Sequence, residues 1–217
     1  MAQDFPRSAN TIARVVLIGL ALALAGGLAA WVIYVWSPLG SRVGQAPPQP
    51  IWFSHRVHTN QVSLDCRYCH TSVEESAFAG IPPTETCQGC HATILAESPL
   101  LRPVQQSLRT GEAIAWNRVH DLPDHTYFNH SVHVRQGFGC DTCHGRVDQA
   151  PLLTQVNQEM TMGWCLECHR QPERFVRPRE EVFNLDWQPP ANQLALGRQL
   201  VAEYGIVSRT SCSICHR

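Results

Sequence analysis

The sequence contains no lysine, so all 17 of its basic residues are arginine. Charged residues of both signs make up only 16% of the chain and the net charge is −1, so nothing indicates binding to nucleic acid. Beyond the N-terminal region, the sequence also lacks long stretches with the alternating pattern of β-strands. A domain with so little regular apolar patterning needs another source of hydrophobic core.

One long uncharged run is present, Val15–Trp36, with 22 residues. As a helix it would be about 33 Å long, close to the hydrocarbon thickness of a bilayer. A cleaved signal peptide is the alternative, since Ala23-Leu24-Ala25 resembles a cleavage site, but the apolar part of a signal peptide is usually only about 7–15 residues long. We therefore predict an uncleaved, single transmembrane anchor over residues 15–36.

Arg7 and Arg14 precede this run and predict a cytoplasmic N-terminus over residues 1–14. The rest of the chain is then expected on the periplasmic side of the cytoplasmic (inner) membrane. Residues 37–50 are rich in proline and glycine and are predicted to form an extended linker. Residues 51–217 are expected to form one mainly α and irregular domain. Its best helix is predicted over 191–204, with these side chains facing inward: Leu194, Leu200, Val201 and Tyr204.

Cysteine, by contrast, is abundant, with ten residues. The chain repeats Cys-x-x-Cys-His five times, which is the attachment motif of c-type haem, and every cysteine belongs to one copy. In this chemistry the two thiols form thioethers with haem vinyl groups, and the adjacent histidine is the proximal iron ligand. The predicted attachment residues are Cys66, Cys69, Cys87, Cys90, Cys140, Cys143, Cys165, Cys168, Cys212 and Cys215, and the predicted proximal ligands are His70, His91, His144, His169 and His216.

Zinc sites and disulfides explain this pattern less well. Structural zinc sites usually combine two Cys-x-x-Cys pairs, or one pair with spaced histidines, and five pairs cannot be divided in that way. Disulfides give no reason for a histidine after every pair. We therefore predict five covalently attached haem c groups that supply the missing core. A domain built in this way should not fold without its haems.

Six further histidines remain for five distal iron positions. Four of them lie in a repeated pattern, Phe53-Ser-His55-Arg-Val-His58 and Phe128-Asn-His130-Ser-Val-His133, and the two copies are 75 residues apart. The repeat indicates duplication of a two-haem module, with a first module at 51–91 and a second at 116–169. Histidines three residues apart on a helical turn are neighbours that can face two different irons.

The fifth distal ligand is predicted to be His120, and the alternatives are Met162, Met160 and His125. The two methionines lie just before the fourth motif, although they also suit apolar packing against a haem edge. A methionine ligand would raise the potential of its haem relative to a pair of histidines.

The Phe-x-His-x-x-His element resembles that of the class III multihaem cytochromes. In that family the first histidine binds the haem that follows it and the second binds a later one. The resemblance implies that His55 serves the haem of His70 and that His130 serves the haem of His144. His58 and His133 would then serve other haems, for which we favour those of His91 and His169.

The anchor, the two modules and the C-terminal haem site together look like the pentahaem subunit of alternative complex III, most specifically in residues 116–144 and 161–170. The resemblance implies a relay subunit within a quinol-oxidising complex. The implied partners are an iron–sulfur subunit related to molybdopterin enzymes, polytopic membrane subunits with quinone sites, and a monohaem cytochrome c subunit or a soluble electron acceptor.

We expect a relay subunit that is not an enzyme on its own. Two other functions are the alternatives. A stand-alone, membrane-anchored multihaem quinol dehydrogenase would need its own quinol pocket at the membrane surface. A terminal reductase would need an open iron position, and the pentahaem nitrite reductases use a lysine as proximal ligand of their catalytic haem, a residue type that this chain lacks. Because the supply of ligands covers every iron position, we expect electron transfer and no catalytic residues.

Overall fold

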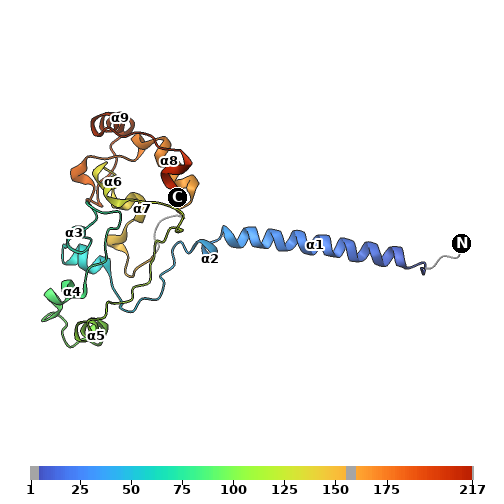
Figure 1. The fold of residues 1–217 in the computed structure, drawn as a ribbon, viewed down its shortest axis with the longest axis horizontal. Helices are drawn as coiled ribbons and strands as arrows, with labels where there is room; N and C mark the ends of the chain where they lie inside the picture. The colour runs from blue at the N-terminus through green and yellow to red at the C-terminus, as the bar shows by residue number, and fades with distance from the viewer. Residues whose placement is uncertain (1–4, 155–159, 217) are drawn as a thin grey trace. The chain divides into compact units, whose positions relative to one another are not determined.

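The computed structural model describes residues 5–154 and 160–216. Contacts within the chain divide it into two units, Met1–Arg42 and Val43–Arg217. The first unit is dominated by the long helix α1 (Ala9–Val35), which is followed by the single turn α2 (Pro38–Ser41) (Figure 1). None of the side chains of α1 is buried, and the helix is long and apolar enough to cross a membrane.

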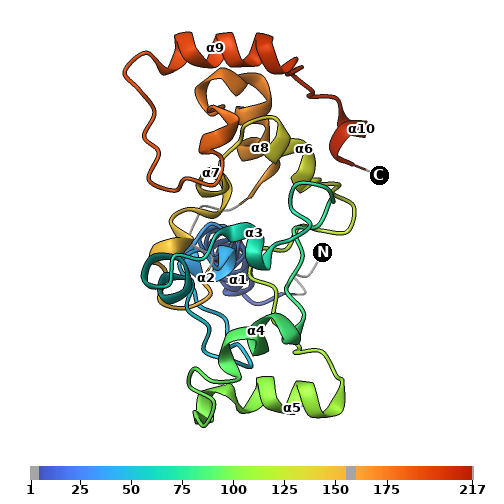
Figure 2. The same cartoon turned by 90° about the vertical axis from the view of Figure 1, so that its left-hand side faces the viewer.

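The second unit consists of short helices joined by long irregular segments (Figure 2). Its described residues form no β-strand, and one isolated antiparallel bridge joins Thr126 to His216. The α-helices of this unit are α3 (Cys66–Cys69), α4 (Thr84–His91), α5 (Arg102–Thr110), α6 (His130–Arg135), α7 (Cys140–His144), α8 (Met162–Arg170), α9 (Gln193–Tyr204) and α10 (Cys212–Cys215). Shorter helical turns are a π-helix at Val57–Gln61 and 3₁₀ turns at Pro99–Leu101, Val147–Gln149, Pro172–Arg174 and Arg179–Glu181.

Side chains alone give this unit a thin hydrophobic core. Within the described ranges, the buried apolar residues are Ile51, Val73, Leu101, Val104, Ala150, Val176, Val182 and Leu200. Only Val176 and Val182 are less than 2% exposed. A domain of this size normally buries one contiguous apolar cluster, so the second unit has the architecture expected when large apolar groups other than side chains fill its centre.

The C-terminal helix α9 lies close to the predicted range, since it begins at Gln193 and ends at Tyr204. Gly205 follows with φ of 66°, a left-handed conformation that ends helices at little cost for glycine. The buried residues of α9 are Gly197 and Leu200, whereas Leu194 is 50% exposed, so the prediction that Leu194 faces inward was wrong. Gly197 sets this face because any Cβ there would collide with the backbone of Glu173.

Candidate functional site: five paired imidazoles

The five Cys-x-x-Cys-His motifs all lie on helical turns, and we number them sites 1 to 5 in chain order. α3, α7 and α10 consist of little else, while α4 and α8 carry their motifs at their C-terminal ends. The amide of His70 donates to the carbonyl of Cys66 at 2.9 Å, and the amide of His216 donates to that of Cys212 at the same distance. These bonds close the turn, so both thiols and the imidazole of a motif start from neighbouring points of the backbone.

Backbone carbonyls fix the orientation of three motif histidines. The Nδ1 atoms lie 2.7–2.9 Å from carbonyl oxygens of Gly80 (for His70), Ile94 (for His91) and Arg209 (for His169). Because a carbonyl can only accept, Nδ1 must carry the proton, and the Nε2 lone pair is left for a metal. Metal-bound histidines usually donate their other ring N–H in this way.

The distal candidates follow the same rule. The Nδ1 atoms of His58, His130 and His133 lie 2.7–2.8 Å from backbone carbonyl oxygens. The acceptors for His58 and His133 are the carbonyls four residues earlier, whereas the acceptor for His130 is Ala77, which lies 53 residues away in the chain. The Nε2 atoms of the proximal and the distal histidines therefore have lone pairs available, and two such nitrogens are the axial ligands of a low-spin haem iron.

Every motif histidine lies close to a second imidazole from elsewhere in the chain. Two imidazoles on one iron have ring centres about 6 Å apart, because each metal–nitrogen bond is about 2 Å long and each ring centre lies about 1 Å further on. The distances between ring centres are 6.4 Å for His55 and His70, 6.2 Å for His58 and His91, 6.3 Å for His130 and His144, 6.1 Å for His133 and His169, and 5.6 Å for His125 and His216. All five pairs thus have the spacing of a shared iron.

The fifth pair differs from the one preferred on sequence grounds, because His125 rather than His120 lies opposite His216. The local backbone explains this placement: the amide of Tyr127 donates to the carbonyl of Cys215 at 2.6 Å, and Thr126 forms a bridge with His216. These contacts hold the segment that carries His125 against site 5. The sequence could not reveal this pairing, because it depends on contacts between segments that are far apart in the chain.

His120 lies instead beside site 3. Its ring centre is 4.6 Å from that of His144, with the ring planes at 88°, and its buried Nε2 has no hydrogen-bond partner. That distance is too short for an iron between the rings, and His144 already lies opposite His130. Of the two methionines weighed as ligands, Met162 is 65% exposed and Met160 is half-buried.

Burial keeps the central imidazoles neutral. It lowers the pKa of His144 to about 3 and that of His55 to about 4, with neighbouring histidines adding smaller effects in the same direction. Burial also lowers the pKa of His133. An imidazole must be unprotonated at one nitrogen to bind a metal, so these environments favour the ligand form.

Comparison with known proteins identifies the family of this chain. Residues 126–217 match the family described as cytochrome c7 and related cytochrome c. Over 163 residues, covering 66% of this chain and 78% of the other, the sequence is 31% identical to the menaquinone reductase multiheme cytochrome c subunit of Nitratidesulfovibrio vulgaris. The chain belongs to the multihaem cytochrome c family. Membership implies electron transport with covalently bound haem c, as the motifs predicted.

The residues of this multihaem cytochrome c fit haem better than the alternatives. The ten cysteines all lie in described segments and form no disulfide. Within residues 5–154 and 160–216, no group of three or more histidine, cysteine or acidic side chains gathers as it would around a zinc ion. The thin side-chain core also favours haem, because large apolar haem plates would fill the space that side chains leave.

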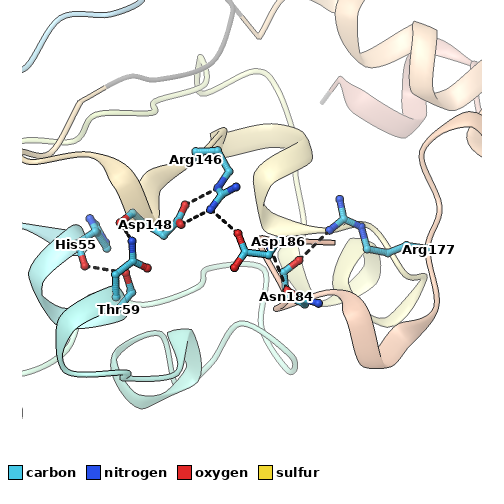
Figure 3. Close-up of polar contacts among 8 residues, drawn as sticks. His55, Thr59, Arg146, Asp148, Arg177, Asn184 and Asp186 are labelled. Carbon is cyan, nitrogen blue, oxygen red and sulfur yellow. Dashed lines mark hydrogen bonds and ion pairs between the residues drawn. The ribbon is translucent and has the colours of Figure 1, made fainter. Parts of the chain in front are cut away.

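Polar contacts hold the turns of the cytochrome together (Figure 3). Arg146, two residues after site 3, binds the carboxylates of Asp148 at 2.6 Å and Asp186 at 2.8 Å. The side chain of Asn60, on the π-helix next to His58, donates to the carbonyl of Asp148 at 2.9 Å. This network ties the histidine turn of the first module to the segment that follows site 3.

Sequence reasoning missed one residue at site 3, Arg177, which is only 3% exposed. Its guanidinium lies 2.9 Å from the carboxylate of Asp141, inside the motif, and 4.5 Å from the ring centre of Trp187. Gly139 permits this approach, because a Cβ there would overlap the guanidinium. The abundance of arginine was the available signal, but it did not single out this position.

Proposed function

We propose that this multihaem cytochrome c is an electron-transfer relay subunit of a membrane-bound, quinone-linked respiratory or photosynthetic complex, and that it holds five haem c groups. The observation that carries the proposal is the set of five imidazole pairs, one for each attachment motif. Haem iron with both axial positions filled changes its oxidation state without binding a substrate. Such a protein transfers electrons and leaves catalysis to its partner subunits.

The proposed ligand assignments follow the pairs. His70, His91, His144, His169 and His216 are the proximal ligands, and in the same order His55, His58, His130, His133 and His125 are the distal ones. His125 takes the place that the sequence suggested for His120. The chain's own part in the chemistry is to hold the Nε2 atoms of six of these ten histidines in position through the Nδ1 hydrogen bonds described above, and to exclude water from the central sites.

Substitution of the two competing histidines tests the fifth assignment. His125→Ala should leave one haem of five without its distal imidazole, and a high-spin, carbon monoxide-binding fraction of about one fifth should appear. His120→Ala is the matched control and should leave all five haems low-spin. The reverse result would show that His120, and not His125, is the distal ligand of the fifth haem. A pyridine haemochrome assay should give five haems per chain, and fewer would overturn the proposal.

The direction of electron flow has two candidates. Resemblance to the pentahaem subunit of alternative complex III supports quinol oxidation, with electrons passing to a periplasmic cytochrome or another acceptor. The relative in Nitratidesulfovibrio vulgaris is a subunit of a menaquinone reductase, which supports the opposite direction. The partner subunits would supply the quinone site in either case, and we propose those named from the resemblance: an iron–sulfur subunit, polytopic membrane subunits and a monohaem cytochrome.

Purification of the intact complex from native membranes distinguishes these cases. Quinol-dependent reduction of a soluble cytochrome supports the first direction, and reduction of menaquinone by an external donor supports the second. The isolated chain should show no quinol turnover. Turnover by the isolated chain would instead identify a stand-alone quinol dehydrogenase. Protease protection of the haem domain in right-side-out and inverted vesicles tests its proposed periplasmic location.

A further inference from the structure

We infer that the five imidazole pairs form one unbranched row in the order site 2, site 1, site 3, site 4, site 5, so that sites 2 and 5 are its two ends. This order differs from the order of the motifs in the chain. The inference rests on the proposed function, because it assumes that each pair binds a haem. Each of the four junctions in the row has its own set of contacts.

The junction between sites 2 and 1 is a single helical turn. His55 and His58 lie three residues apart and face His70 of site 1 and His91 of site 2. Phe53 packs against both, with ring centres 5.0 Å from His55 and 4.6 Å from His58. The attachment turns adjoin as well, since a Cβ on Gly89 of site 2 would lie 3.8 Å from the hydroxyl of Tyr68 in site 1.

The junction between sites 3 and 4 repeats this arrangement. His130 and His133 on α6 face His144 of site 3 and His169 of site 4. Phe128 packs against the two distal rings at 4.8 Å and 4.5 Å. One turn of helix therefore sets the separation of the two sites within each module.

Sites 1 and 3 join the two modules. The carbonyl of Ala77, in the loop after site 1, accepts from both the Nδ1 of His130 at 2.8 Å and its backbone amide at 3.2 Å. The backbone amide of Ser131, next to His130, donates to the carbonyl of Ser76 in the same loop at 3.1 Å. Thus a distal residue of site 3 is positioned by the loop of site 1.

Sites 4 and 5 join through the segment that leads into α10. The carbonyl of Arg209 accepts from the Nδ1 of His169 at 2.9 Å, and the hydroxyl of Ser208 donates to the His169 carbonyl at 2.6 Å. Cys212, the first residue of site 5, follows three residues after Arg209. Site 5 is thereby fixed against the proximal side of site 4.

Exposure of the attachment turns agrees with this order. Of the ten cysteines, the two exposed ones are Cys90 in site 2 and Cys212 in site 5. In sites 1, 3 and 4, inside the row, both cysteines are half-buried. Figures 1 and 2 agree that α4, α3, α7 and α8 follow one another in space, and Figure 2 shows α10 beyond α8. Redox partners would therefore meet the row at site 2 and at site 5.

Spectroscopy of methionine-ligand variants tests the order in the full-length holoprotein. A methionine ligand raises the potential of its haem, which can then be reduced alone and made diamagnetic. At that poise, electron paramagnetic resonance shows which other ferric haems lose a magnetic neighbour. His58→Met, at an end of the row, should change one other signal, and His55→Met, inside the row, should change two.

An arrangement in chain order predicts the reverse, one changed signal for His55→Met and two for His58→Met, and that result would overturn the inference. His125→Met and His133→Met are the controls at the other end of the row, where both arrangements predict one changed signal for His125→Met and two for His133→Met. In the unmodified protein, nuclear Overhauser contacts between haem methyl groups provide a test without substitutions: contacts between the haems of sites 1 and 3 support the order, and contacts between those of sites 2 and 3 contradict it. Haem stoichiometry and quinone-linked activity test the proposed function separately.

Discussion

In the first module Phe53 stacks on His58 with ring planes at 18°, and in the second Phe128 stacks on His133 with ring planes at 25°. In both modules the Nδ1 of the second histidine donates to the carbonyl four residues earlier, at 2.8 Å and 2.7 Å. The repeated sequence therefore gives nearly the same ring arrangement twice. Such agreement shows that local geometry, carried by six residues, sets how two imidazoles diverge.

The modules differ in the structure around this turn. The first histidine turn continues into the π-helix Val57–Gln61, whereas the second forms the α-helix α6 with Asn129 as its N-cap. The first module packs through Ile51 against an apolar cluster with Leu101 and Val104, which lie on the segment between the modules. The second module is supported by residues from outside it, including the buried Arg177. Thus the same motif can be supported by different surroundings.

Replacement of Arg177 should give the largest difference between the modules. Arg177→Met leaves the Asp141 carboxylate, 22% exposed, without its partner, and should lower the free energy of unfolding by about 3–5 kcal/mol. Arg67→Met is the control in the first module. Its pair with Asp65 is about half exposed, so the loss should be only about 0–1 kcal/mol. Denaturant unfolding of the two holoprotein variants provides the measurement, and equal losses would remove the distinction.

Gly197→Ala should separate α9 from the turn that follows the second module. A Cβ would overlap the carbonyl of Glu173, so we expect a loss of about 1–3 kcal/mol from the strain. Gly163→Ala on α8 is the matched control, because a Cβ there meets only ordinary contact at 3.8 Å. Its melting temperature should be unchanged or slightly raised, as alanine favours helix. A similar fall in both variants would contradict the packing described for α9.

The tie between the modules should depend on pH. Arg146 holds the pKa of Asp148 below its usual value, mainly through their hydrogen bond. A carboxylate with a lowered folded pKa stabilises the fold above its unfolded pKa of about 4, and this stability is lost as the pH falls through the folded value. Asp148→Asn should therefore cost about 1–3 kcal/mol at neutral pH, and its difference from wild type should shrink in acid.

Asp186→Asn serves as the control for this effect. Asp186 binds the same arginine, but its side chain is 85% exposed, so the loss should be about 0–1 kcal/mol with little dependence on pH. Unfolding free energies measured from neutral to acid pH compare the two. A difference for Asp148→Asn that persists unchanged at low pH would show that its charge is not responsible.

Helix capping should give the smallest contrast. The side chain of Asn129 accepts from the amide of Val132 and the hydroxyl of Ser131, so Asn129→Ala should cost about 1 kcal/mol. Ser54 has a comparable place in the first module, but it accepts one bond, from the amide of Val57 at 3.4 Å, and lacks the second bond that Ser131 gives Asn129 at 2.8 Å. Ser54→Ala should cost less, measured as a smaller fall in melting temperature. A larger fall for Ser54→Ala than for Asn129→Ala would contradict this ranking.

Much of the site could be read from the sequence because it is local. The Cys-x-x-Cys-His motifs form compact turns, and the Phe-x-His-x-Val-His repeat places two imidazoles on one turn. The structure places the expected partners opposite four of the five motif histidines. The fifth could not be read in this way, because His120 and His125 are both spare histidines in an irregular segment.

By itself, the sequence determined the apolar N-terminal helix, the five Cys-x-x-Cys-His turns and the repeated Phe-x-His-x-Val-His turn, since each depends on residues that are close in the chain. Tertiary structure decided the partner of His216, the buried place of Arg177 and the proximity of site 1 to site 3. Those features arise where distant backbone carbonyls, such as those of Ala77, Arg209 and Cys215, accept hydrogen bonds from the site segments. Every residue type has such a carbonyl, so no pattern of side chains reveals which one will be used.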